Sequence, residues 1–305
     1  MIFLLFVLQY YNIYGIIKFR FKKEDFFMRK IIGETFDQER ALYGVGFVCL
    51  TDCKFDGEAD GESALKESNN IKTEKCFFNL RYPLWHDNKV DIIGCEMSSL
   101  CRAPLWYTTE VLASRSVLHG PKALRECRDI SIDHCDIDSV EFGWFSSNIK
   151  ILNSMAKGEY FMLRAKELDL EDVDFSGKYS FQYIENAVFE NCNFDTKDAF
   201  WHAKNVTVKN CVVKGEYLAW YSENVTFENC VISGTQPLCY CKGLRLINCE
   251  MHDADLAFEL SDVEATITTP MISIKNPLQG RISVPCVDEL ISDDIGSTCE
   301  IVFTA

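Results

Sequence analysis

All five tryptophans of this chain recur at one position of a repeated segment and form a single predicted column of side chains. The same position also carries Lys66 and Arg125, so we do not expect the column to be buried. The next position adds carboxylate, imidazole and phenol groups. Flat indoles beside such groups suit stacking on sugar rings and bonding of their hydroxyls. The residues assigned to binding are Lys66, Trp85, Arg102, Trp106, Tyr107, Glu126, Trp201 and Trp220.

Three residues of these columns are candidates for catalysis, namely His86, Glu67 and Arg125. A polysaccharide lyase needs one base and a cation that neutralises a uronate. His86 or Lys66 is the candidate base, and Arg125 or Arg102 is the candidate cation. These residue types leave open whether the chain is an enzyme or only binds its ligand.

A glycoside hydrolase is less well supported by the same columns. Glu67 and Glu126 are predicted three turns apart, which is about 14 Å. Paired catalytic carboxylates are roughly 5–9.5 Å apart. The position of His86 beside Glu67 is equally compatible with a structural hydrogen bond.

We favour the tryptophan pair Trp85 and Trp106 as the site, because charged residues and His86 surround it. The pair Trp201 and Trp220 has only one histidine beside it. Cations in an otherwise acidic chain suggest an anionic sugar. The alternative is a structural, self-assembling protein whose tryptophan ridge is a homo-oligomer interface, with no catalysis.

The columns follow from a repeat of 19 residues, visible in the apolar residues Val206, Val225, Leu244 and Val263. Each repeat is predicted to have two alternating apolar strands, a corner that is often Asn, a corner that is often Gly, and a third apolar strand. There is no helical period. We therefore predict an all-β fold, a single-stranded right-handed parallel β-helix of about 11 to 12 coils, with identical positions stacked about 4.8 Å apart.

The repeat divides the chain into three parts. Residues 1–27 lie outside the pattern and are predicted to be an extraneous or unstructured extension, with a signal or anchor as alternatives. Residues 28–270 are the predicted β-helix, and residues 271–305 the predicted cap strands. Two insertions, near residues 57–62 and 98–101, fall at the same corner. Loops at such corners often form binding faces, which favours the N-terminal half for function.

Charge and cysteine content exclude several classes of function. The net charge of −15 argues against nucleic acid as a partner. We expect no membrane segment within the repeat. The chain has 15 cysteines but no C-x-x-C pair, so we expect no cofactor and no metal. A ladder of unbridged, inward cysteines suits the cytoplasm. Its predicted members are Cys53, Cys76, Cys95, Cys135, Cys192, Cys211, Cys230 and Cys249.

Several segments outside the strict repeat resemble an uncharacterised, mainly bacterial family built on a domain of unknown function. They are residues 61–68, 78–86, 122–127 and 234–241, and the resemblance runs from about Met28 to the C-terminal tail. It implies a pectin-lyase-like right-handed β-helix and says little about activity. Members are sometimes labelled as hydrogenases, but this chain lacks the paired cysteine motifs that such a centre needs.

Overall fold

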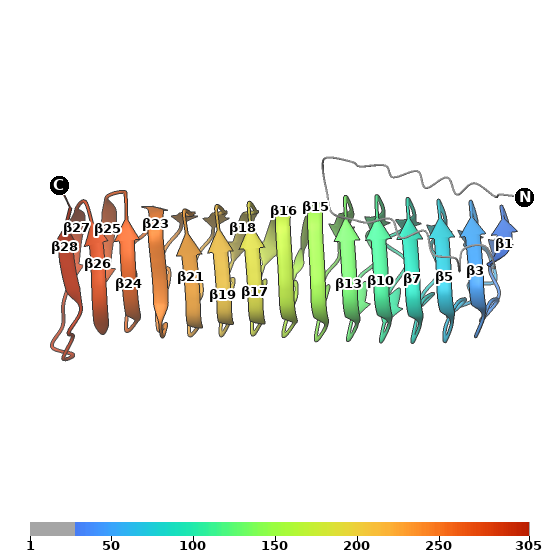
Figure 1. Cartoon of the computed structure of the whole chain (residues 1–305), viewed down its shortest axis with the longest axis horizontal. Coiled ribbons are helices and arrows are strands. Elements are labelled where there is room, and N and C mark those ends of the chain that lie inside the picture. Colours follow the sequence, from blue (N-terminus) through green and yellow to red (C-terminus); the bar gives the residue numbers. More distant parts are fainter. Residues whose placement is uncertain (1–27, 305) are drawn as a thin grey trace, which may run out of the picture.

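The computed structural model describes residues 28–304, in which there is no helix. Parallel strands stack in about 14 turns of a β-solenoid, which confirms the predicted fold class. The strands of the first side form the long row in Figure 1. They are β1 (Arg29–Ile32), β3 (Gly46–Thr51), β5 (Asn69–Glu74), β7 (Asn88–Ile93), β10 (Thr109–Ser114), β13 (Arg128–Asp133), β15 (Ser147–Glu159), β16 (Lys166–Lys178), β17 (Glu185–Glu190), β19 (Lys204–Lys209), β21 (Glu223–Glu228), β23 (Leu244–His252), β24 (Asp262–Ile267), β26 (Gln279–Val284) and β28 (Glu300–Phe303).

The 19-residue repeat sets the register of the first side. Val206 of β19 lies opposite Val225 of β21, and Val208 lies opposite Phe227. All four side chains are buried. Stacking of equivalent apolar positions in successive turns therefore makes one continuous core, as the repeat predicted.

The second side consists of shorter strands that follow a corner. At this corner Asn210 and Asn229 have positive φ, which Asn tolerates, and Asn229 Nδ2 donates to Asn210 Oδ1 at 3.4 Å. In β15, β16 and β23 the strand continues through the corner onto the second side. The other second-side strands are β2 (Thr35–Phe36), β4 (Lys54–Phe55), β6 (Phe77–Phe78), β8 (Glu96–Met97), β11 (Val117–Leu118), β14 (Asp136–Asp138), β18 (Asn193–Lys197), β20 (Val212–Lys214) and β22 (Val231–Ser233).

The third side differs from the prediction, because most turns have no third strand. Among residues 28–304, strands occur there only as the pair β9 (Leu105–Trp106) and β12 (Leu124–Arg125), and as the pair β25 (Met271–Lys275) and β27 (Val287–Ile291) near the end. Elsewhere the chain makes tight turns, since residues on both sides of the tryptophan position have positive φ, as Phe200 (60°) and His202 (55°) do. The expected alternation survives, with Phe200 buried and Trp201 half-buried.

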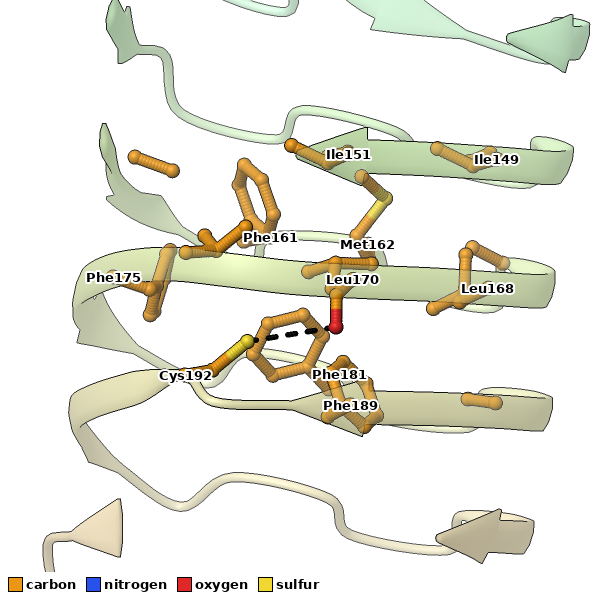
Figure 2. Close-up of a cluster of buried hydrophobic side chains, with 14 of the residues drawn as sticks. Ile149, Ile151, Phe161, Met162, Leu168, Leu170, Phe175, Phe181, Phe189 and Cys192 are labelled. Carbon is orange, nitrogen blue, oxygen red and sulfur yellow. Dashed lines mark hydrogen bonds between the residues drawn. The ribbon is translucent and has the colours of Figure 1, made fainter. Parts of the chain in front are cut away.

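The core is filled by stacked aliphatic and aromatic side chains. Figure 2 shows Phe161, Phe175, Phe181 and Phe189 gathered in the interior of neighbouring turns. Phe181 and Phe189 meet edge to face, with ring centroids 5.1 Å apart. Such contacts add stabilisation beyond the burial of apolar area.

Buried cysteines belong to this core. All eight cysteines of the predicted column are buried and unbridged. The thiol of Cys192 lies 3.6 Å from the carbonyl oxygen of Leu170 in the preceding turn (Figure 2). The backbone N–H of Cys192 in turn contacts Sγ of Cys211 at 3.3 Å. Thiols here act as small apolar side chains with weak hydrogen bonds.

An exposed column of alternating charge runs along the start of the first-side strands. Lys166 Nζ is 2.8 Å from Glu185 Oε2, and Lys204 Nζ is 3.2 Å from Glu223 Oε2. Glu185 and Lys204 are themselves paired in the strand register. Glu223 forms a parallel backbone β-bridge with Lys242 in the next turn. Exposed pairs of this kind contribute little individually.

The ends of the solenoid extend beyond the predicted 11 to 12 coils. At the C-terminal end, β26 pairs with β24 and β28 pairs with β26, both in parallel, so the predicted cap continues the stack. Residues 1–27, predicted to be an extension, lie outside the described residues. Within residues 28–304, no helix has the length and apolar character needed to cross a bilayer.

Candidate functional site

The structure places the predicted site residues of the N-terminal half on successive turns. The backbone N–H of Glu67 donates to the Trp85 carbonyl at 2.8 Å, and that of His86 donates to the Trp106 carbonyl at 2.9 Å. The backbone N–H of Tyr107 likewise donates to the Arg125 carbonyl in the next turn, at 3.0 Å. Both predicted columns are therefore real features of the third side, although it consists mostly of turns.

The local conformation directs the charged and phenolic column outward. Glu67, His86, Tyr107 and Glu126 have φ values of 62°, 59°, 58° and 50°. A non-glycine residue in this region costs roughly 1–2 kcal/mol, so the stacked turns must hold it there. All four side chains are exposed as a result.

The tryptophans pack mainly on one another. Trp85 and Trp106 stack with ring centroids 5.2 Å apart and planes 5° from parallel. Trp106 Nε1 donates to the carbonyl oxygen of Lys122 at 2.7 Å. Trp201 and Trp220 stack in the same way at 5.4 Å. The indole faces within each pair are thus closed to a sugar ring, and the half-buried rings present their edges.

Arg125 continues the column beyond Trp106. Its guanidinium lies 5.0 Å from the centroid of Trp106 and 5.6 Å from that of Trp144, within cation–π range of both. Arg125 Nε is buried and has no hydrogen-bond partner in the described part of the chain, although it forms an ion pair with Glu126 Oε1 at 3.4 Å. Lys66 lies over the other end of the pair, 5.9 Å from the Trp85 ring.

The candidate catalytic residues are engaged in other contacts. The His86 ring stacks on Tyr107, with centroids 4.7 Å apart. Glu67 accepts a hydrogen bond from the Tyr43 hydroxyl, and this bond raises the pKa of Tyr43. No hydrogen bond joins His86 to Glu67 within residues 28–304, so the structural bond considered above is not formed. Catalysis by these residues stays a prediction.

Three of the predicted binding residues, Trp201, Trp220 and Arg102, lie apart from the Trp85–Trp106 pair. Trp201 and Trp220 lie with His202 on later turns, and His202 stacks between Tyr183 at 4.7 Å and Tyr221 at 5.2 Å. Arg102 lies on the corner after the second side, where its side chain is exposed. Arg102 also does not line a surface hollow that lies beside Arg125.

This hollow of about 500 Å³ was not predicted from the sequence. Besides Arg125 and Glu126 it is lined by Cys127, Arg128, Phe145 and Ser147. Arg128 follows Arg125 by three residues, so the two guanidinium groups stand on either side of the corner between the third and first sides. The three-residue spacing of the two arginines was the signal available in the sequence, but Arg128 begins strand β13 of the first side, so the column of Arg125 does not include it.

Asp87, next to His86, was also missed. Its side chain is buried in a corner column that carries mostly small residues such as Ser68, Thr108 and Ser146. Oδ1 accepts a hydrogen bond from the backbone N–H of Ser68 at 2.8 Å, while Oδ2 has no partner among the residues that the structure describes. Desolvation raises the pKa of Asp87 to about 8, against the opposing effect of the backbone hydrogen bonds.

Within residues 28–304, no three His, Cys, Asp or Glu side chains are grouped in a way that could hold a metal ion. A search of curated protein sequences finds no match.

Comparison with solved structures finds proteins with low sequence identity. The A-module of mannuronan C-5 epimerase AlgE4 from Azotobacter vinelandii is 11% identical, with a TM-score of 0.32 over 79% of this chain and 91% of that one. The catalytic domain of a GH87 alpha-1,3-glucanase in complex with nigerose is 9% identical, with a TM-score of 0.33 over 79% of this chain and 63% of that one. At these scores nothing about the activity of this chain follows from either protein.

The family model described as "Protein of unknown function (DUF3737)" matches residues 29–302, nearly the whole of the described solenoid. This agrees with the resemblance found in the sequence, and the chain belongs to that family.

Proposed function

We propose that the protein binds an acidic saccharide on its third side, at the hollow beside Arg125. The observation that carries this proposal is the position of Arg125 between Trp106 and Trp144, next to an open hollow of about 500 Å³. Two aromatic rings restrict the guanidinium, so less side-chain entropy is lost when a ligand binds. A carboxylate is the natural partner, since guanidinium groups bind it through two parallel hydrogen bonds.

The surroundings of the hollow suit a sugar better than a bare anion. Phe145 lines the hollow and is 46% exposed, which offers an apolar ring to the C–H groups of a sugar. Ser147 and Glu126 supply hydroxyl and carboxylate groups for its hydroxyls. Arg128 adds a second cation to a protein whose net charge is −15. The ligand contacts ring edges and Phe145 rather than the closed faces of Trp85 and Trp106.

Binding without catalysis is the form of the proposal that the contacts support. The Glu67 carboxylate already accepts the Tyr43 hydroxyl, and His86 is stacked on Tyr107 with no carboxylate bonded to its ring among the described residues, so the contacts do not form an acid–base pair. We further propose a reducing compartment such as the cytoplasm, because 12 of the cysteines are buried and none is bridged.

Calorimetric titration with two matched ligands tests the proposal. A uronic-acid hexasaccharide should bind the parent protein, and a glucose hexasaccharide should bind this hollow much more weakly. Arg125→Gln should weaken uronate binding by about tenfold or more, and Arg125→Lys by less, because charge is kept but the bidentate fork is lost. The control Arg245→Gln, on the exposed face of the first side, should bind like the parent, as should Trp201→Ala. Equal uronate affinity in parent and Arg125→Gln would contradict the proposal.

A second candidate function is self-association through the later turns of the third side. Tyr221 is 45% exposed and stacks in a continuous column with His202 and Tyr240. A row of stacked aromatic side chains on the surface often contacts a partner. Sedimentation velocity should then show a dimer that Tyr221→Asp dissociates, whereas Val188→Asp on the first side leaves it intact. A monomer at all concentrations would remove this candidate.

A further inference from the structure

A second hollow, of about 420 Å³, lies over the second side of the middle turns. Its lining comes from β14, β18, β20 and the later halves of β15 and β16, with His119 at one end. It shares no residue with the hollow beside Arg125. Its volume falls in the range of small-molecule sites, roughly 300–1,000 Å³.

The hollow exists because a small side chain interrupts a column of long ones. Ser176 of β16 lies opposite Lys157 in the preceding turn and Asp195 in the following turn. Each neighbour is paired with the residue on its far side. Lys157 Nζ is 3.3 Å from Asp138 Oδ2, and Lys214 Nζ is 3.3 Å from Asp195 Oδ2. The space above Ser176 therefore stays open.

The adjacent column supplies a polar pair between two apolar side chains. Asn193 Nδ2 donates to Asp174 Oδ1 at 2.6 Å. Met155, 65% exposed, lies opposite Asp174 on one side of this pair, and Val212, 43% exposed, lies opposite Asn193 on the other. Asp174 forms no ion pair with any residue in the described part of the chain. Its second oxygen and the remaining amide groups of Asn193 are free to bond a ligand.

This lining has the chemistry that recognises an uncharged sugar. A carboxylate beside an amide offers an acceptor and a donor to neighbouring hydroxyls, and Met155 and Val212 can contact the apolar face of the ring. The four carboxylates of the lining outnumber its two lysines, so an acidic sugar is disfavoured. They are Asp136, Asp138, Asp174 and Asp195.

We propose that this groove, centred on Asp174, Ser176 and Asn193, is a binding site for an uncharged oligosaccharide. The proposal stands on this groove alone and holds whether or not an acidic sugar binds beside Arg125. The two sites then select ligands of different charge on different sides of one solenoid.

The experiment is calorimetric titration of the full chain with uncharged glucose and mannose hexasaccharides of different linkage, and with a uronic-acid hexasaccharide. At least one uncharged hexasaccharide should bind. Ser176→Phe fills the hollow and should weaken that binding by about tenfold or more. The matched control is Ser233→Phe, at the same position of a later turn outside the groove, which should bind like the parent.

Asp174→Asn keeps the shape and tests the carboxylate, so it also serves if Ser176→Phe fails to unfold cooperatively. It should weaken binding of the uncharged sugar and leave uronate binding unchanged. Arg125→Gln should do the reverse, so the two proposed sites can fail independently. The proposal is overturned if no uncharged hexasaccharide binds, or if Asp174→Asn and a folded Ser176→Phe bind as the parent does.

Discussion

Trp85 and Trp106 stack with their planes 5° from parallel, and the outer face of Trp106 lies against the guanidinium of Arg125. Each ring is thus a structural element of the third side as well as a candidate contact. A loss of ligand binding in a tryptophan variant can therefore reflect a lost contact or a loosened turn. Stability must be measured beside affinity.

Trp106→Ala should lower the free energy of unfolding by about 2–4 kcal/mol. It removes the stack on Trp85, the cation–π contact with Arg125, a hydrogen bond and half-buried apolar area. Trp106→Phe keeps a ring but loses the bond to the Lys122 carbonyl, and should cost about 1 kcal/mol from that bond. Urea denaturation followed by circular dichroism measures both. A Trp106→Ala protein as stable as the parent would mean that the stack carries no stability.

The buried carboxyl of Asp87 makes stability depend on pH. Its pKa is about 8 in the folded protein, above its ordinary value of 3.8, so the folded state holds a proton that the unfolded state has lost between these two values. Stability should therefore fall as pH rises from about 4 to about 8, by a few kcal/mol in total. Asp87→Asn should match the parent at pH 4, be more stable at pH 8, and flatten this dependence.

Thermal unfolding of parent and variant across this pH range measures the effect. Asp253→Asn is the matched control, because this carboxyl is exposed and its removal should leave the pH dependence unchanged. If parent and Asp87→Asn lose stability equally as pH rises from 4 to 8, Asp87 is ionised in the folded protein and the argument from desolvation is wrong.

Gly215→Ala should destabilise the protein by about 2–4 kcal/mol. A Cβ at this corner would lie 1.9 Å from the carbonyl oxygen of Thr196 in the preceding turn, and φ is 151°. Gly94→Ala separates the two causes, since φ there is 60° but the nearest atom is the flexible Lys75 Cγ at 3.9 Å. It should cost only about 1–2 kcal/mol. Equal losses in the two variants would show that contact with the preceding turn is unimportant.

Thiol reactivity should follow burial. Cys286 is exposed and should react first with a disulfide reagent, followed by the half-buried Cys49 and Cys299. The other 12 cysteines are buried, and desolvation raises the pKa of Cys127 to about 12 and that of Cys241 to about 11. They should react only on unfolding, as counted by mass spectrometry of alkylated peptides. Fast labelling of Cys211 in the native protein would contradict the burial of its column.

The sequence was sufficient to predict the solenoid because its apolar positions repeat at a constant interval. Val206 and Val225 occupy equivalent positions, and parallel pairing follows once both must face one core. The third side was less predictable. Inward Phe200 and outward Trp201 alternate as they would in a strand, but residues with positive φ produce the same alternation in a turn.

The candidate sites depend on features that a repeat does not encode. Whether Trp85 offers a face or an edge depends on its rotamer, which the next tryptophan in the stack restricts. Ser176 looks like an ordinary exposed serine, and only the outward pairing of Lys157 and Asp195 leaves a hollow above it. Asp87 is the acidic residue in a column of mostly small side chains, but its raised pKa follows from enclosure by neighbouring turns.

In the column from Lys166 to Lys242 the sign of the charge alternates from one turn to the next, so odd and even turns are not equivalent. Excising residues 204–222 removes one complete turn and keeps every apolar position in register, yet it places Glu185 directly against Glu223. Excising residues 204–241 removes two turns and places Glu185 against Lys242, which restores opposite charges. The core can therefore shorten by any whole turn, whereas this column favours shortening in steps of two.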